Sequence, residues 1–143
     1  MKDFYLKLTS RGGAAHVTVA SVRGAIQCTE FADEHTSEWF CRCLVNVPFR
    51  FNSVGCDAIL AAGGIPVLFD LIRRWPTTLE VVLNACIALN NIAAVGSPAV
   101  KTAMMTVPGF EALLRSAKAS GLAVDGRDGR SIASAVLAKL GLA

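Results

Sequence analysis

Apolar residues at helical spacing form the clearest pattern in the chain, and they lie in residues 79–94, LEVVLNACIALNNIAA. The positions recur every three or four residues, which predicts one apolar face of an α-helix: Leu79, Val82, Leu83, Cys86 and Leu89. Thr77, with Glu80 three residues later, fits a capping box at the start, and Gly96 marks the end. We therefore expect a helix over residues 79–94.

A second apolar stripe precedes this helix in residues 63–74, GGIPVLFDLIRR. Its members again follow helical spacing: Ile65, Leu68, Phe69 and Ile72. The Gly63–Gly64 pair predicts a tight turn, and Pro66 is tolerated because it would stand in a first helical turn. The pattern predicts a second amphipathic helix here.

The two segments recur along the chain. At a shift of 45 residues, CRCLVN (41–46) aligns with CIALNN (86–91). The same shift aligns AILAAGGIPVLF (58–69) with AMMTVPGFEALL (103–114). A period of this length that contains only helical segments is typical of an α-solenoid.

Two weaker copies extend the repeat toward both ends. Residues 132–141, IASAVLAKLG, match the long helix at a shift of 48, and residues 11–19 faintly resemble the glycine-pair segment. The chain of 143 residues has the length of one domain. We therefore predict a single all-α domain of about three repeats: 1–49, 50–96 and 97–143.

Composition narrows the class of protein. Hydrophobic residues make up 53% of the chain and charged residues 17%, which favours large buried faces or apolar surface that a partner covers. The net charge of +3 is too small to predict nucleic-acid binding. No apolar window is long enough to predict a membrane span or a signal peptide. The five cysteines form no disulfide framework, so we expect reduced thiols that fill the core of an intracellular protein, in the cytoplasm or, less favoured, the nucleus.

No catalytic or metal-binding pattern stands out in the sequence. His35, Cys41 and Cys43 are close in sequence, but on a helix residues 41 and 43 point about 200° apart and cannot share one ion. Residues 125–130, DGRDGR, lack the acidic register of a calcium loop and predict a solvated connection whose arginines could contact a partner. We therefore predict a protein without metal, cofactor or enzymatic activity.

Three asparagines interrupt the apolar helix: Asn84, Asn90 and Asn91. A buried amide needs every polar atom satisfied, so these residues either lie at a solvated edge or face something that they bind. Spacings of three and four residues put Asn84, Ile87 and Asn91 on one helix face. An amide can match a peptide unit with one donor and one acceptor. This pattern indicates that Asn84 and Asn91 face a binding groove and that Asn90 lies at its rim.

Residues 61–114 resemble the armadillo-repeat family. They contain that family's glycine pair followed by Ile-Pro, an apolar second helix and a third helix that ends in ALNNIA (88–93). The resemblance implies a right-handed α-solenoid of three-helix repeats, with short first helices at 53–62 and 97–106. It also implies a concave groove, lined by the third helices, that binds a partner protein or an extended peptide.

The resemblance also suggests which residues line the groove. In peptide-binding members of the family the third helix carries a tryptophan and, four residues on, an asparagine. Asn46 and Asn91 occupy the asparagine position in the first two repeats, and Lys139 occupies it in the third. The tryptophan position holds other residues, so recognition of a nuclear-localisation peptide is not implied: Arg42, Ile87 and Ala135. The expected groove residues are Trp39, Arg42, Asn46, Asn84, Ile87, Asn91 and Lys139.

Each signal also has a purely structural interpretation. Asn46 and Asn91 could bond backbone carbonyls between repeats and stiffen the stack. Trp39 could be half buried against the next repeat, and Arg42 could pair with Glu38 four residues earlier. Two functional hypotheses follow. One is a non-enzymatic module that binds a protein or an extended peptide, and the other is a structural protein that self-associates into a homo-oligomer through its terminal repeats.

Overall fold

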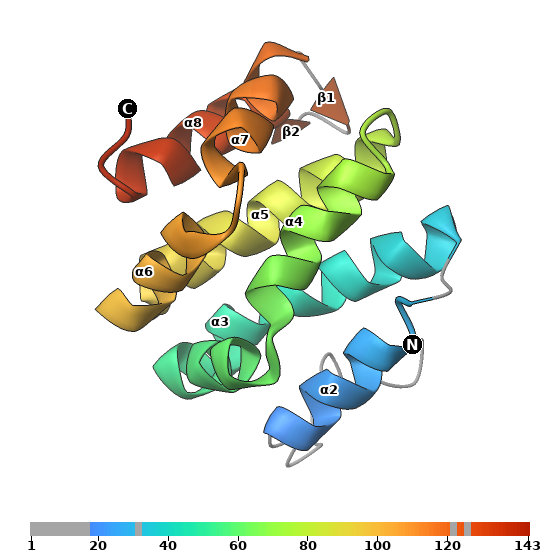
Figure 1. Cartoon of the computed structure of the whole chain (residues 1–143), viewed down its shortest axis with the longest axis vertical. Coiled ribbons are helices and arrows are strands. Elements are labelled where there is room, and N and C mark those ends of the chain that lie inside the picture. Colours follow the sequence, from blue (N-terminus) through green and yellow to red (C-terminus); the bar gives the residue numbers. More distant parts are fainter. Residues whose placement is uncertain (1–17, 31–32, 121–122, 125–126) are drawn as a thin grey trace.

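The described part of the chain is almost entirely helical, which confirms the all-α prediction (Figure 1). The computed structural model describes residues 18–30, 33–120, 123–124 and 127–143. Its helices are α2 (Val19–Gln27), α3 (Glu34–Ala62), α4 (Gly64–Arg74), α5 (Leu79–Val95), α6 (Pro98–Thr106), α7 (Phe110–Ala119) and α8 (Gly129–Lys139). Two short antiparallel strands, β1 (Ala123–Val124) and β2 (Arg127–Asp128), form a hairpin between α7 and α8.

Both helices that the apolar stripes predict are present. The first is α4, which begins directly after Gly63, a residue in the left-handed region at φ 78°. The second is α5, which matches the predicted range to within one residue. The predicted capping box is wrong, because α5 begins after Thr78 rather than after Thr77. The residue three positions beyond Thr78 is Val81, whose side chain cannot complete such a box.

The long helix α3 consists of two helical stretches, 34–51 and 53–62, separated at Asn52. Asn52 has φ 51° and ψ −143°, which interrupts the regular helix. The second stretch corresponds to the short helix expected at 53–62, and α6 corresponds to the one expected at 97–106. Ser97 is the N-cap residue of α6, and Pro98 occupies its first turn.

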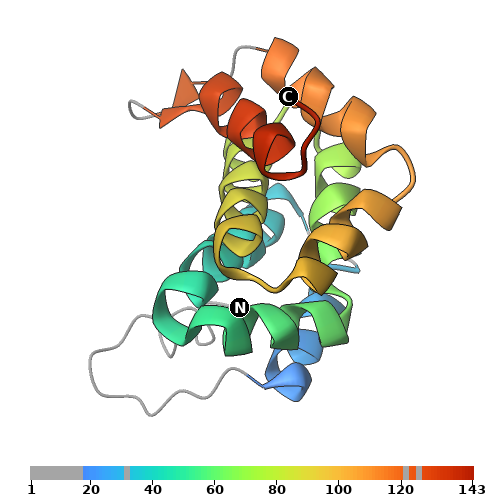
Figure 2. The ribbon, with the colours of Figure 1, turned by 90° about the vertical axis from the view of Figure 1, so that its left-hand side faces the viewer.

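The helices follow one another in sequence order from α2 at one end to α7 and α8 at the other (Figures 1 and 2). Helix α4 contacts both α2 and α7, and helix α5 contacts both α3 and α8. The buried apolar side chains of α2 through α8 form one continuous core. Helices α4 and α5, in the middle of the chain, therefore each contact a helix that precedes them and a helix that follows them.

Two long-range hydrogen bonds join the last residue of α4 and the residue after it to the segment from the end of α2 to the start of α3. The Nε1 of Trp75 donates to the hydroxyl of the buried Ser37 over 3.1 Å. The guanidinium of Arg74 donates to the backbone carbonyl of Thr29 over 2.8 Å. The end of α4 is thus held against the end of α2 and the start of α3 by polar contacts as well as by apolar packing.

Two sequence expectations fall partly or wholly outside the described residues. The faint copy of the glycine-pair segment at residues 11–19 lies almost entirely outside them, and so do residues 125–126 of the expected solvated connection. The rest of that connection is regular structure, so the expectation is wrong for 127–130. Asp128 is the reason α8 begins there, because its carboxylate accepts from the backbone N–H of Arg130 (3.0 Å) and from the hydroxyl of Ser131 (2.6 Å).

The break in α3 provides a test of the packing. A Cβ atom added at Gly55 would lie 2.6 Å from Cγ1 of Val47 and 2.8 Å from Cβ of Phe51. A Cβ added at Gly24, inside α2, would meet no atom within 4 Å. We expect Gly55→Ala to lower the free energy of unfolding by about 1–3 kcal/mol through overpacking. Gly24→Ala should raise it by up to about 1 kcal/mol because alanine is the better helix former.

Urea unfolding followed by far-ultraviolet circular dichroism measures both changes. A Gly55→Ala variant as stable as the wild type would mean that the two stretches of α3 do not pack as closely as described.

Candidate functional site

The seven expected groove residues lie on three helices that contact one another in turn. Helix α3 carries Trp39, Arg42 and Asn46, helix α5 carries Asn84, Ile87 and Asn91, and helix α8 carries Lys139. Because α5 contacts both α3 and α8, the structure brings these helices together around α5. The side chains themselves differ in burial and in hydrogen-bond partners, although the sequence predicts that all of them line one groove.

Asn46 and Asn91 each use one amide N–H in the fold. The Nδ2 of Asn46 donates to the carbonyl of Arg42 in its own helix over 3.0 Å. The Nδ2 of Asn91 donates to the carbonyl of Val45 over 3.1 Å and so joins α5 to α3. The structural interpretation is therefore confirmed for Asn91 as far as a bond to a backbone carbonyl of another helix. Asn46 bonds only its own helix.

The carbonyl oxygens of these two amides reach solvent. Both side chains are half-buried. Within the described residues no group donates to the Oδ1 of Asn46 or of Asn91, and no buried side-chain nitrogen or oxygen there lacks a hydrogen-bond partner. Each amide is thus held by one N–H and keeps an accessible acceptor and a second N–H.

Lys139 makes the corresponding contact from α8. Its ammonium donates to the Oδ1 of Asn90 over 2.8 Å, which joins α8 to α5. Asn90 is half-buried, as is Lys139. The polar residues of α5 therefore bond both neighbouring helices, Asn91 on one side and Asn90 on the other.

Asn84 does not face an open groove, so that prediction is wrong. Its side chain is 2% exposed, and its Nδ2 donates to the carbonyl of Glu80 over 2.8 Å. The cause is the packing of this part of α5, where residues 81–86 are all buried. Strand β1 also contacts α5, near the N-terminal end of that helix (Figures 1 and 2). Ile87, the next predicted groove residue on α5, is half-buried.

A compact polar and aromatic cluster occupies the first turns of α3. The Nε1 of Trp39 donates to the Nε2 of His35 over 2.8 Å, and the guanidinium of Arg42 lies 5.6 Å from the centre of the Trp39 ring. Arg42 also forms an ion pair with Glu38 at 2.7 Å, as its structural interpretation predicts. The indole is therefore held between an imidazole and a guanidinium, and its orientation is restricted.

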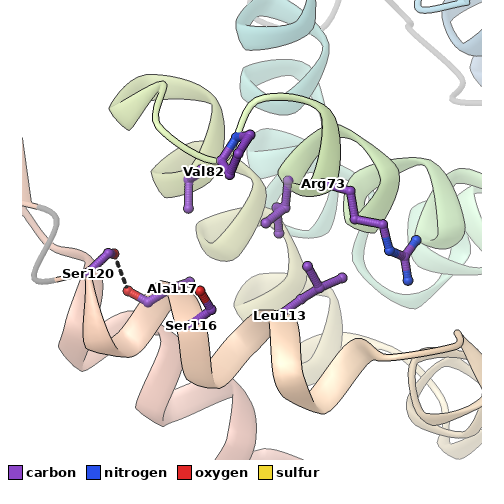
Figure 3. Close-up of a pocket in the computed structure, with 8 residues that line it drawn as sticks. Arg73, Val82, Leu113, Ser116, Ala117 and Ser120 are labelled. Carbon is purple, nitrogen blue, oxygen red and sulfur yellow. Dashed lines mark hydrogen bonds between the residues drawn. The ribbon is translucent and has the colours of Figure 1, made fainter.

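A small pocket lies away from these residues, between the end of α4, the start of α5 and α7 (Figure 3). It has a volume of about 220 Å³. Its lining is Ile72, Arg73, Pro76, Val82, Leu113, Ser116, Ala117 and Ser120. The hydroxyl of Ser120 donates to the carbonyl of Ala117, and the Arg73 side chain extends away from the two serines (Figure 3). In the sequence, only the helical spacing of the α7 residues could have indicated this pocket, and the same spacing is found in ordinary core packing.

The cysteines divide into one exposed and four buried thiols. Burial raises the pKa of Cys56 to about 11 and the pKa of Cys43 and Cys86 to about 12, and it also raises the pKa of Cys41. These four thiols stay protonated at neutral pH and act as small core residues, as expected. Cys28 is exposed at the end of α2, so the expectation of a core position is wrong for it.

Neither a metal-ligand cluster nor a single membrane-length apolar helix is present in the described residues. No group of three or more His, Cys, Asp and Glu side chains there is arranged to hold a metal ion. No single helix in the same ranges is both long and apolar enough to cross a membrane. Only α3 and α4 taken together, bent by 69°, reach that length and composition.

Comparisons with protein-family models, with curated proteins and with solved structures found no match to this chain. The resemblance of residues 61–114 to armadillo repeats therefore stays a prediction.

The two asparagines allow a matched test of the cross-helix bond. We expect Asn91→Ala to lower the free energy of unfolding by about 1 kcal/mol, because it removes a hydrogen bond between α5 and α3. Asn46→Ala, which removes a bond within one helix, should cost less. Chemical denaturation of both variants measures the difference, and equal losses would contradict a stabilising role for the Asn91 bond.

The thiols allow a test of burial. With Ellman's reagent at pH 8, the native protein should release one equivalent of chromophore rapidly, from Cys28, and the remaining four only after unfolding. Cys28→Ser should remove the fast phase. Two or more fast equivalents in the native protein would contradict the burial of the other cysteines.

Proposed function

We propose that the chain is a short, right-handed armadillo-like solenoid of about three repeats that binds a partner protein or an extended peptide without catalysis. The observation that carries the proposal is the pair of amides on α3 and α5. Asn46 and Asn91 stand 45 residues apart, and each is anchored by one N–H while its Oδ1 stays accessible. We define the surface of α3, α5 and α8 that carries Asn46, Asn91 and Lys139 as the amide face.

The order of helix contacts supports a stack of similar units. Helices α2, α4 and α7 begin 45 and 46 residues apart and contact one another in that order. Helices α3, α5 and α8 do the same at spacings of 45 and 50 residues. Nearest-neighbour contacts at a period of 45 to 50 residues are typical of solenoid repeats.

The chemistry of the amide face suits an extended polypeptide. A peptide unit offers one N–H and one C=O, and an anchored amide presents the complementary acceptor and donor. Because Nδ2 already bonds a helix carbonyl, each amide loses little conformational freedom on binding. Trp39, braced by His35 and Arg42, adds an aromatic surface of the kind that is enriched in interface hot spots.

Self-association is a second candidate, and the exposed apolar residues beside the break in α3 favour it. Phe49 is 69% exposed and Val54 is 70% exposed, so two large apolar side chains stand on the surface on either side of Asn52. A second copy that covers them would form a homo-oligomer. We place either function inside the cell, in keeping with the free thiols.

Peptide selection tests the first function. We expect the immobilised wild-type protein to select peptides from a random linear dodecapeptide display library. The double variant Asn46→Ala, Asn91→Ala should bind the selected peptides at least about tenfold more weakly in fluorescence anisotropy, a loss of about 1.4 kcal/mol. The matched control is Thr102→Ala, Ser116→Ala, which removes two exposed hydroxyls on α6 and α7.

Failure to select any peptide, or equal binding by the amide variant and the control, would contradict the proposal. A purely homo-oligomeric protein would show no selection and a mass in light scattering that rises with concentration.

A further inference from the structure

A basic hollow lies between α7 and α8, at the end of the chain opposite α2. It has a volume of about 390 Å³ and is lined by Arg115, Lys118, Ala119 and Arg130. None of the expected groove residues lines it. Arg115 and Lys118 are three residues apart on α7 and so share one face, and Arg130 comes from the first turn of α8.

Arg115 is held in place by the fold. Its Nε and Nη2 donate to the Oε1 of Glu111 over 2.9 and 2.7 Å. Nη2 also donates to the backbone carbonyl of Leu142, beyond the end of α8, over 3.3 Å. One guanidinium therefore links α7 to the segment after α8 and stands at a defined position beside the hollow.

The other two cations differ from Arg115 in their bonding. The side chains of Lys118 and Arg130 are exposed, and within the described residues neither forms a hydrogen bond or an ion pair. Glu111 is the ion-pair partner of Arg115. Asp128, which is near enough to Arg130 for a favourable charge interaction, directs its oxygens to the start of α8. Among the described residues, three cations thus gather at one hollow, and the carboxylate of Glu111 is bonded to one of them.

Helix stability does not account for this arrangement. Lys118 lies in the last turn of α7, where a cation interacts favourably with the helix dipole. Arg130 lies in the first turn of α8, where a cation is unfavourable, and that turn holds no acidic residue. Arg130 therefore adds to the repulsion among the cations, and the carboxylate of Asp128, which attracts it, is already bonded to the start of α8.

We propose that this basic hollow binds a phosphoryl group carried on a partner polypeptide. A guanidinium matches phosphate oxygens with two parallel N–H donors, and an ammonium adds a point charge. The hollow's lining of Ala119 and the aliphatic stems of the three cations contains no aromatic side chain, which gives a nucleobase no ring to stack on. The net charge of +3 also disfavours a nucleic acid. The choice of a polypeptide rests on the proposed function.

The experiment uses two pools of fluorescein-labelled nonapeptides. One has phosphoserine at the centre and random residues elsewhere, and the other has serine at the centre. By anisotropy at about 0.15 M salt, where the screening length is about 8 Å, the wild-type chain should bind the phosphoserine pool at least about tenfold more tightly. The variant Lys118→Ala, Arg130→Ala should lose that preference.

The control is Arg23→Ala, Lys101→Ala, which removes the same two charges from α2 and α6 and should keep the preference. Equal binding of the two pools by the wild type, or equal losses in the two double variants, would overturn the proposal. Binding of inorganic pyrophosphate as tight as that of the phosphoserine pool would also overturn it, because the hollow would then bind a free anion rather than a phosphoryl group on a polypeptide.

The amide variant separates this inference from the proposed function. If Asn46→Ala, Asn91→Ala abolishes binding of both pools while Lys118→Ala, Arg130→Ala keeps the phosphoserine preference, the basic hollow is overturned and the amide face stands. If the amide variant binds both pools as tightly as the wild type and the phosphoserine preference is lost only in the Lys118→Ala, Arg130→Ala variant, the basic hollow is supported and the amide face fails.

Discussion

The burial of α5 on nearly all sides is the constraint on which the rest of the structure depends. Its residues 81–86 are all inaccessible, and α3, α4, α8 and β1 lie against it. A helix that is apolar around most of its circumference is stable only when neighbours cover it. The polar residues that α5 does carry must then be bonded. The amides of Asn84 and Asn91 accordingly donate to backbone carbonyls, one within α5 and one on α3.

The same constraint shapes the surface that remains open around α5. Asn91 reaches across to α3, and Asn90 receives the ammonium of Lys139 from α8. These bonds hold the polar side chains in defined orientations, which lowers the entropy that a ligand would have to remove on binding. Trp39 is restrained in the same way by groups on its own helix.

The charged side chains fall into two groups, those that form ion pairs within a helix and those that gather at the basic hollow. The ion pairs of the described residues join positions three or four apart on one helix, and exposed pairs such as Arg73 with Asp70 contribute little to stability. The cations around the basic hollow differ, because Lys118 and Arg130 add charge without adding a bond to the fold. Side chains that folding does not use are the ones available to a ligand.

Periodicity along the chain was enough to predict α4, α5 and the helical class, because helix formation depends on residues three and four positions apart. The spacing of Arg42 and Glu38 likewise predicted their pairing. Periodicity could not predict the burial of Asn84, since a half-exposed helix face and a fully covered one have the same sequence pattern until the neighbouring elements are known. The partner of Asn91, the hydrogen bond between Trp75 and Ser37, and the convergence of Arg130 with Lys118 were likewise decided by the tertiary structure. Each joins residues that only the packing of separate helices brings within reach of one another.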